Sequence, residues 1–322
     1  MSPASSNRTR LDRGFAAIER LSASGRLPVR VHASIRRAAL EVAIGRGLRS
    51  GDPLGVPLGP PDGRGRVGWL KLFGDGTLGS RTALLLDPYE PEPARGEPPG
   101  GPLGVAVTSA EELADLAERA AVGGVTTQIH AIGDRALRGA LDALAPTAGR
   151  TALRPRIEHV QLADQADMPR FAAHGIFASV QPHHLSGDAP RVRPTWGDRA
   201  RNSYPWRRLA DFGAVLAFGT DAPTDSVDPW PGLAMAITRR DPVWADDSGA
   251  FFPNEVLTIG QALRASCVGP ALASGELDRG RLVTGHRADL VVVPAGVLSD
   301  AEVLRSARPR LVLMDGVPVH EV

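Results

Sequence analysis

Four ionisable residues in this sequence are of types that could together bind a metal ion. Lys71, His130, His159 and Asp221 each lie at or near the end of a short apolar segment, just before a loop or the start of a helical segment. Two imidazoles and two further donors at one place would make a site for a hard or borderline metal, with zinc as the leading candidate. Lys71 is also unusual in its residue type, because the other 36 of the 37 basic residues are arginine.

Each of these residues alone is open to a structural interpretation. A single histidine at a strand end is more often a hydrogen-bonded core residue than a metal ligand. Asp221, in the segment GTDAP, could cap the following turn, and Lys71 could be a surface charge. The occurrence of all four in order, each near the end of a predicted strand, is what favours a shared site.

Six predicted strands, separated by helical segments, would position these residues. The strands are expected at 27–35, 67–73, 124–131, 154–161, 175–182 and 213–221. Helices are expected at 11–25, 109–124, 134–145, 166–175 and 257–275. Ser109 and Asp134 are the predicted N-caps of the second and third helices. Strands that alternate with helices predict βα units around a parallel sheet, whose carboxyl ends would bring the four residues together.

Two long connections are predicted to lack regular structure. Residues 87–104 are dense in proline and glycine, and residues 186–208 carry two tryptophans among arginines. Connections of this length in a compact domain are usually functional lids or disordered segments. After residue 256 the pattern changes to one helix and two short strand segments, at 288–294 and 310–321, which are too few for an independent domain.

Composition and charge exclude several classes of protein. The 322 residues are 43% apolar and 23% charged, with a net charge of +1, so nothing favours nucleic acid or an anionic membrane as a partner. Cys267 is the only cysteine, which excludes an intramolecular disulfide and suits a reducing compartment. No apolar stretch has the length of a signal-peptide core or a membrane span. We expect a cytoplasmic protein that acts on a small molecule and could form a homo-oligomer.

Five segments carry a resemblance to a known family. They are KLFGDGTLGSRTALLLDPY, HAIGDRAL, RIEHVQLADQADMPRFAAHGIFASVQPHHL, FGTDAP and GRLVTGHRADLVVV. In this order they resemble the amidohydrolase superfamily, and within it the family-3 branch that includes N-substituted formamide deformylase. The resemblance covers roughly residues 20 to 320. It implies a (β/α)8 TIM-barrel-type hydrolase with a small β-sandwich, and metal-dependent hydrolysis, usually of a carbon–nitrogen bond.

The resemblance also implies roles for individual residues. Lys71 matches the lysine of the fourth barrel strand, which is expected to carry a carbamate formed from CO2. A carbamate needs a neutral primary amine, which arginine cannot provide. His130 and His159 match metal ligands on the fifth and sixth strands, with a divalent ion, zinc above all, as the cofactor. Asp221 matches the aspartate of the eighth strand, a metal ligand that also takes the proton of the attacking water. The residues expected to contact the substrate are Arg81, His183 and His184.

The sequence departs from the family's pattern at its beginning. Family members carry a His-x-His pair at the end of the first barrel strand, and no such pair occurs here. The first histidine, His32, lies on the strand that aligns with the third, so the six predicted strands correspond to the third to the eighth. We therefore expect an N-terminally truncated member, with an incomplete barrel over residues 1–280 and the C-terminal part of the sandwich over 281–322. The alternatives are a non-catalytic remnant and a hydrolase of esters or lactones.

Overall fold

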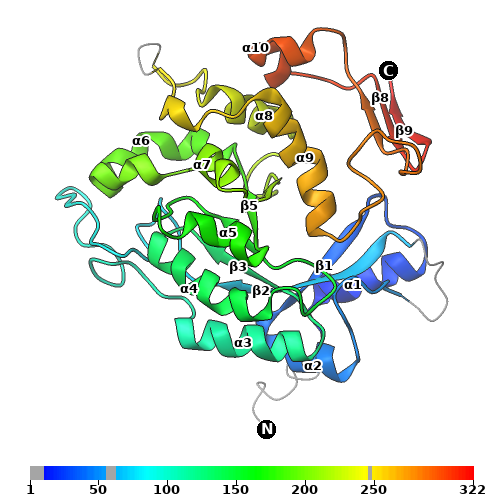
Figure 1. The fold of residues 1–322 in the computed structure, drawn as a ribbon, viewed down its shortest axis with the longest axis horizontal. Coiled ribbons are helices and arrows are strands. Elements are labelled where there is room, and N and C mark those ends of the chain that lie inside the picture. The colour runs from blue at the N-terminus through cyan, green and yellow to red at the C-terminus, as the bar shows by residue number, and fades with distance from the viewer. Residues whose placement is uncertain (1–10, 56–62, 246–248) are drawn as a thin grey trace.

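A six-stranded parallel sheet forms the centre of the protein. The computed structural model describes residues 11–55, 63–245 and 249–322. The strands lie side by side in chain order (Figure 1). They are β1 (Val31–Arg36), β2 (Gly65–Phe73), β3 (Thr127–Ala131), β4 (Arg156–His159), β5 (Phe177–Val180) and β6 (Leu216–Phe218). All six strands predicted from the sequence are therefore present, and every neighbouring pair is parallel.

Helices connect successive strands and cover the sheet. In the described residues they are α1 (Arg13–Ala23), α2 (Leu40–Gly45), α3 (Ala110–Val122), α4 (Asp134–Leu144), α5 (Met168–His174), α6 (His184–Trp196), α7 (Trp206–Asp211), α8 (Trp230–Thr238), α9 (Ile259–Ala273) and α10 (Ala301–Arg305). Helices α3 and α4 lie next to each other on one side of the sheet (Figure 1). Helix α9 packs directly on β6, because a Cβ atom at Gly269 would lie only 1.9 Å from the carbonyl oxygen of Leu216.

The helix termini confirm one predicted cap and correct another. The Ser109 hydroxyl accepts a hydrogen bond from the Glu112 amide and begins α3, as predicted. Asp134 is not the N-cap of α4, because that position is occupied by Gly133. The Asp134 carboxylate instead accepts from the amide of Leu86 at 2.8 Å. The side chain predicted to cap a helix therefore holds the long loop after β2.

The segment 186–208 is helical rather than irregular, which corrects the sequence-based prediction. It contains most of α6, a 3₁₀-helix at Gly197–Asn202 and the start of α7. Its apolar side chains explain the order, because Trp196 and Trp206 are fully buried in the main core. Burial of two such large aromatic side chains outweighs the helix-breaking effect of Pro190 and Pro194 within α6.

A separate three-stranded antiparallel sheet lies near the C-terminus. Its strands are β7 (Leu290–Val292), β8 (Leu311–Met314) and β9 (Val317–Glu321), in that order. Asp315 and Gly316, both with positive φ, form the tight turn between β8 and β9 that the Asp-Gly pair predicts. Arg30, just before β1, contacts Asp289 at 2.8 Å and Asp315 at 2.6 Å. These ion pairs tie the small sheet to the start of the parallel sheet.

None of the helices in the described ranges is both long enough and apolar enough to cross a membrane.

Candidate active site

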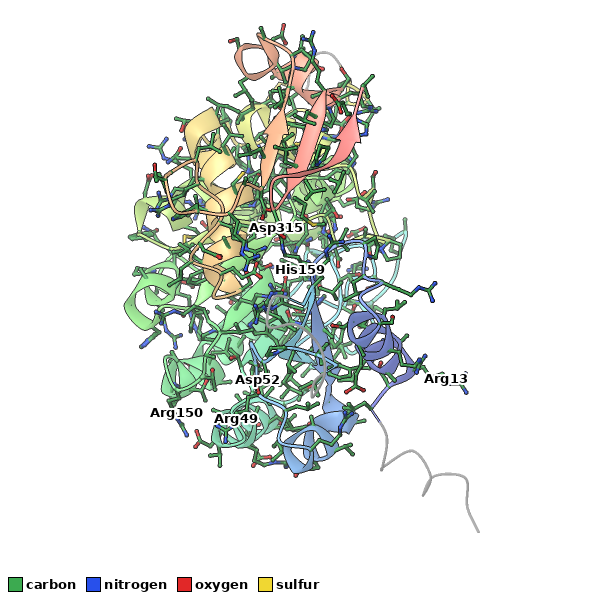
Figure 2. All side chains as sticks on the ribbon, turned by 90° about the vertical axis from the view of Figure 1, so that its right-hand side faces the viewer. Arg13, Arg49, Asp52, Arg150, His159 and Asp315 are labelled. Atoms are coloured by element: carbon green, nitrogen blue, oxygen red, sulfur yellow. The ribbon has the colours of Figure 1, made fainter. Side chains whose placement is uncertain are left out.

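The carboxyl ends of the parallel strands open into a cavity of about 780 Å³. Lys71 lies near the end of β2, His130 near the end of β3 and His159 at the end of β4, while Asp221 follows β6. The side chains that line the cavity are Lys71, Phe73, Thr77, Leu78, His130, Ile132, His159, Gln161, His183, His184, Ser186, Asp188, Asp221, Thr224 and Asp225. All four residues singled out for metal chemistry therefore reach one cavity. Figure 2 shows His159 near the middle of the molecule, whereas Arg13 and Arg150 lie at its periphery.

His130 is buried and held in one orientation by the loop after β2. Its Nε2 lies 2.9 Å from the carbonyl oxygen of Gly76 and 3.5 Å from an Asp75 carboxylate oxygen. A carbonyl can only accept, so Nε2 carries the proton and Nδ1 keeps a free lone pair. Burial lowers the pKa of His130 to about 4. The imidazole is therefore neutral at pH 7, which is the form that binds metals.

Asp75 completes this support and is itself fully buried. Its carboxylate accepts hydrogen bonds from the amides of Leu84, Ile132 and Gly133 at 2.8 to 3.0 Å. Burial raises the pKa of Asp75 to about 7, against the opposing effect of these three amides. Asp75 thus joins the loop after β2 to the segment that follows His130.

His159 is a second buried imidazole of the cavity. Its ring lies edge-on to that of His130, with 4.5 Å between the ring centroids. Its Nδ1 lies 2.8 Å from Oε1 of Gln181. Burial, reinforced by the proximity of His130, lowers the pKa of His159 to about 3. The backbone of His159 has φ of 78°, a conformation that is rare for a residue other than glycine and that often occurs at functional sites.

The two depressed imidazole pKa values predict a loss of stability in mild acid. Unfolded histidines take up protons near pH 6.5, whereas folded His130 and His159 do so only near 4 and 3. The unfolded chain therefore binds more protons than the folded chain below pH 6.5. Each of the two histidines should lower the free energy of unfolding by about 1.4 kcal/mol for each pH unit in this range. We expect urea unfolding of chelator-treated protein at pH 7, 6 and 5 to show this decline.

A matched variant isolates the contribution of one histidine from that of the carboxylates. In His159→Gln the free energy of unfolding should fall less steeply as the pH is lowered. The difference in slope should correspond to the uptake of close to one proton, because glutamine does not titrate. Identical pH dependence in the variant and the wild-type protein would show that His159 is not buried in its neutral form.

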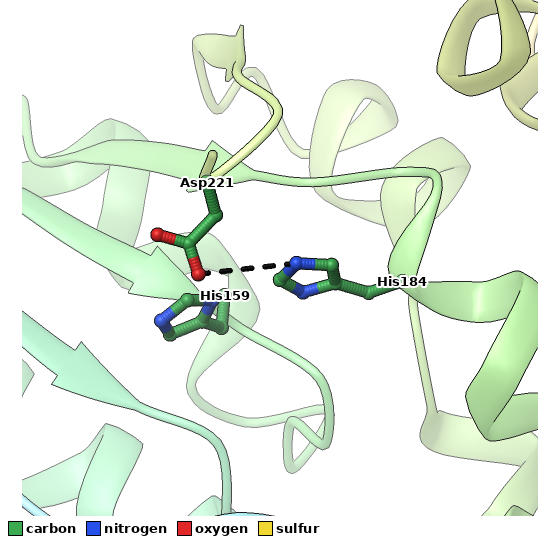
Figure 3. A group of neighbouring side chains, drawn as sticks. All are labelled: His159, His184 and Asp221. Atoms are coloured by element: carbon green, nitrogen blue, oxygen red, sulfur yellow. Dashed lines mark ion pairs between the residues drawn. The ribbon is translucent and has the colours of Figure 1, made fainter. Parts of the chain in front are cut away.

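His159 also belongs to a second cluster of donor atoms in the cavity. One donor atom from each of His159, His184 and Asp221 lies within 4.8 Å of the others, a spacing suited to a metal ion (Figure 3). The His184 Nε2 atom is 3.9 Å from Asp221 and 3.8 Å from Asp225. It is buried, and it has no hydrogen-bond partner among the described residues. Such an orphaned nitrogen fits a site that is completed by a ligand.

Asp221 is the most accessible member of this cluster. Its side chain is 43% exposed, and its backbone has φ of 57°. Partial burial raises the pKa of Asp221, while His184 and Lys71 oppose the rise. A carboxylate that is open to the cavity can accept a proton from a nearby water molecule.

Lys71 lines the same cavity, and burial lowers the pKa of its ammonium against the opposing charge of Glu158. Its Nζ lies 4.9 Å from the centre of the Phe73 ring. Within the described part of the chain it forms no hydrogen bond or ion pair. A buried lysine with a lowered pKa is easier to deprotonate, which is the state that reacts with CO2.

The residues expected to contact substrate fall into two groups. His183 and His184 both line the cavity, and His183 Nε2 lies 3.7 Å from Asp225. Arg81 is not among the described residues that line it. Its guanidinium donates to the carbonyl oxygen of Gly96 at 2.6 Å and lies over the Tyr89 ring. The structure therefore places Arg81 within the loop at 81–96, away from the cavity.

Several residues of the site were not identified from the sequence. Asp225 lies opposite His183 and His184, Gln181 supports His159, and Asp75 supports His130. Asp75 stands in the GDG segment after β2, and Gln181 stands in the QPHH segment after β5. The available signal was a polar residue shortly after a predicted strand for Asp75, and near the end of one for Gln181.

Histidines and acidic groups thus lie together at the carboxyl ends of a parallel α/β sheet. The chain belongs to the amidohydrolase family, whose model, described as "Amidohydrolase family", matches residues 5–320. It is 30% identical to the Bacillus subtilis protein YtcJ, named as a candidate amidohydrolase, over 86% of this chain and 49% of that protein. It is 27% identical to the N-substituted formamide deformylase of Arthrobacter pascens, over 76% of this chain and 46% of that enzyme.

A solved structure shares this fold. It is an uncharacterized metal-dependent hydrolase from Pyrococcus horikoshii, 30% identical, with a TM-score of 0.72 over 86% of this chain and 53% of that one. The chain thus spans about half the length of the relatives that it matches.

Proposed function

We propose that the protein hydrolyses carbon–nitrogen bonds, other than peptide bonds, in small amides, with the help of a bound divalent metal ion. The observation that supports this most is the pair of buried neutral imidazoles, His130 and His159, whose rings lie 4.5 Å apart at the cavity. Two imidazoles with oxygen donors and an open side suit a catalytic metal, and zinc above all. N-substituted formamide deformylase, among the relatives, acts by its name on an amide.

The residues present fit such an ion. His159 has one ring nitrogen free after its bond to Gln181, and the buried His184 Nε2 lacks a hydrogen-bond partner. Asp221 supplies a carboxylate within 4.8 Å of both. A carbamate on Lys71 would add a second anionic oxygen beside His130 and His159. The residues that would hold the ion are thus His130, His159, Asp221 and carboxylated Lys71, with His184 as an additional donor.

Asp221 would move the proton during hydrolysis. When bound, the metal lowers the pKa of a water molecule and polarises the scissile carbonyl. Asp221 would accept a proton from the attacking water molecule while the oxygen of the water bonds to the carbonyl carbon. It then gives the proton to the departing nitrogen as the carbon–nitrogen bond breaks, so that the products are an acid and an amine. Asp221 is suited to both transfers because its side chain lines the cavity and is 43% exposed.

We propose that the six parallel strands are the third to eighth strands of a (β/α)8 barrel. On this basis residues 1–280 belong to the barrel, and residues 281–322 belong to the small β-sandwich. In barrels of this kind the loops at the carboxyl ends of the strands determine the substrate. The loop after β2 and the start of α6 line the cavity here, through Thr77, Leu78 and Ser186 among others.

The proposal predicts hydrolysis together with a limited metal content. We expect protein loaded with zinc in bicarbonate buffer to hydrolyse N-formyl and N-acetyl amines, and to bind no more than one tightly held ion per chain. Elemental analysis of dialysed protein gives the stoichiometry, and amine release gives the rate, with Asp221→Asn as the inactive control.

Lactones and carboxylic esters of the same size form the comparison panel. Faster lactone hydrolysis would identify the protein as an esterase, because the same activated water attacks either carbonyl. Zinc binding without turnover on any substrate would favour a non-catalytic remnant, and two stoichiometric ions would contradict the single-site proposal.

A further inference from the structure

A line of largely buried polar side chains crosses the sheet beneath the cavity. In β1, the Ser34 hydroxyl accepts from Nε2 of Gln128 in β3 at 2.7 Å. Gln128 Oε1 accepts in turn from Nε and Nη2 of Arg156 in β4, at 2.9 and 2.5 Å. Arg156 Nε also lies 2.7 Å from Oε1 of Glu158, and the guanidinium stacks on the Trp69 ring at 3.9 Å. Arg156 is therefore fixed between an amide and a carboxylate.

The same line continues to His159. Gln181, directly after β5, places its Nε2 at 3.5 Å from Oε2 of Glu158 and at 3.4 Å from the carbonyl oxygen of Ser179. Its Oε1 lies 2.8 Å from Nδ1 of His159. Glu158, Gln181 and His159 are all more than nine-tenths buried, so water has little access to compete for these bonds.

The side chains in this line differ in whether they can donate or accept a hydrogen bond, and this determines which atom donates in each contact. Arg156 can only donate, and an ionised Glu158 can only accept. Nε2 of Gln181 faces two acceptors, Oε2 of Glu158 and the carbonyl oxygen of Ser179, and a backbone carbonyl can only accept. Gln181 must then point its NH2 group toward Glu158 and its carbonyl toward His159. That carbonyl can only accept, so the proton of neutral His159 lies on Nδ1.

We propose that Glu158 and Gln181 are positioning residues, which hold His159 as its Nδ1–H tautomer and leave the Nε2 lone pair for the metal. This inference rests on the proposed function only for the identity of the ligand. The tautomer itself is a property of the polypeptide, set by the two acceptors that face the Gln181 amide group. Neither positioning residue needs to touch the metal or the substrate. Partners of this kind typically change metal affinity by about 10- to 100-fold.

Nitrogen-15 NMR of the full chain, labelled at histidine and treated with chelator, tests the inference directly. In the wild-type protein we expect the His159 signals of an Nδ1–H, Nε2-unprotonated ring at pH 7. An Nε2–H ring in the wild-type protein would overturn the proposal without any variant. This readout does not depend on hydrolysis, so it separates a failure of this inference from a failure of the proposed function.

Two variants then test the positioning residues. Gln181→Leu removes the acceptor, and Glu158→Gln removes the group that forces the orientation of Gln181. Each should shift His159 toward a mixture of tautomers and weaken zinc binding by about 10- to 100-fold in chelator competition. Gln161→Leu is the matched control, a buried amide of the same cavity without a bond to His159, and it should keep the wild-type tautomer. Retention of both the tautomer and zinc affinity in Gln181→Leu and Glu158→Gln would refute the proposal.

Discussion

Replacement of Lys71 by arginine is expected to abolish zinc binding and hydrolysis together, although it conserves the charge of the ammonium. A guanidinium cannot form a carbamate, so the site would lose an anionic oxygen ligand. It would gain a permanent cation beside His130 and His159, which would repel a metal ion. Zinc content and amine release, both measured in bicarbonate buffer, should fall to background in Lys71→Arg.

A structural role for Lys71 predicts the opposite result. If the lysine were only a charge at the cavity wall, arginine should leave metal binding intact. Lys71→Met provides the matched comparison, because it removes the carbamate without adding a cation. Weak residual zinc in Lys71→Met, with none in Lys71→Arg, would separate loss of the ligand from repulsion. Equal zinc occupancy in Lys71→Arg and the wild-type protein would contradict the carbamate.

The convergence of the four residues could be predicted because it depends on a regular pattern. Short apolar segments alternate with helices, and parallel strands place all their carboxyl ends on one side. A polar residue at a strand end is therefore located by its position in the chain alone. Lys71, His130 and His159 follow this rule, since each lies within three residues of the end of its strand. Asp221 follows it too, just beyond β6.

The residues that the pattern missed depend on packing between distant segments. The approach of His184 to Asp221 follows from α6, which begins at His184 and is held in place by buried Trp196. The sequence analysis interpreted residues 186–208 as an irregular connection, because two tryptophans lie among many arginines there. Asp134 was misassigned for a similar reason, since a local cap motif cannot reveal that the carboxylate binds the amide of Leu86. Long-range partners of this kind leave no periodic signal.

Replacement of His159 by alanine is expected to weaken zinc binding more than replacement of any other single histidine. His159 is the histidine common to both arrangements of donors, because it lies 4.5 Å from the His130 ring and also belongs to the cluster with His184 and Asp221. An ion held in either arrangement would lose a ligand in His159→Ala. We expect the zinc affinity of His159→Ala to fall by more than about 100-fold, the upper limit for residues that only support a ligand.

Three further histidine variants complete this test. His174→Ala, at the exposed end of α5, is the matched control and should bind zinc like the wild-type protein. Loss of zinc in His130→Ala, with retention in His184→Ala, would place the ion on the His130 side, where carboxylated Lys71 is expected. The reverse pattern would place it between His159, His184 and Asp221, and would make His184 a metal ligand that the family resemblance does not supply. Wild-type zinc affinity in His159→Ala would contradict both arrangements, since no donor set proposed for this cavity omits that imidazole.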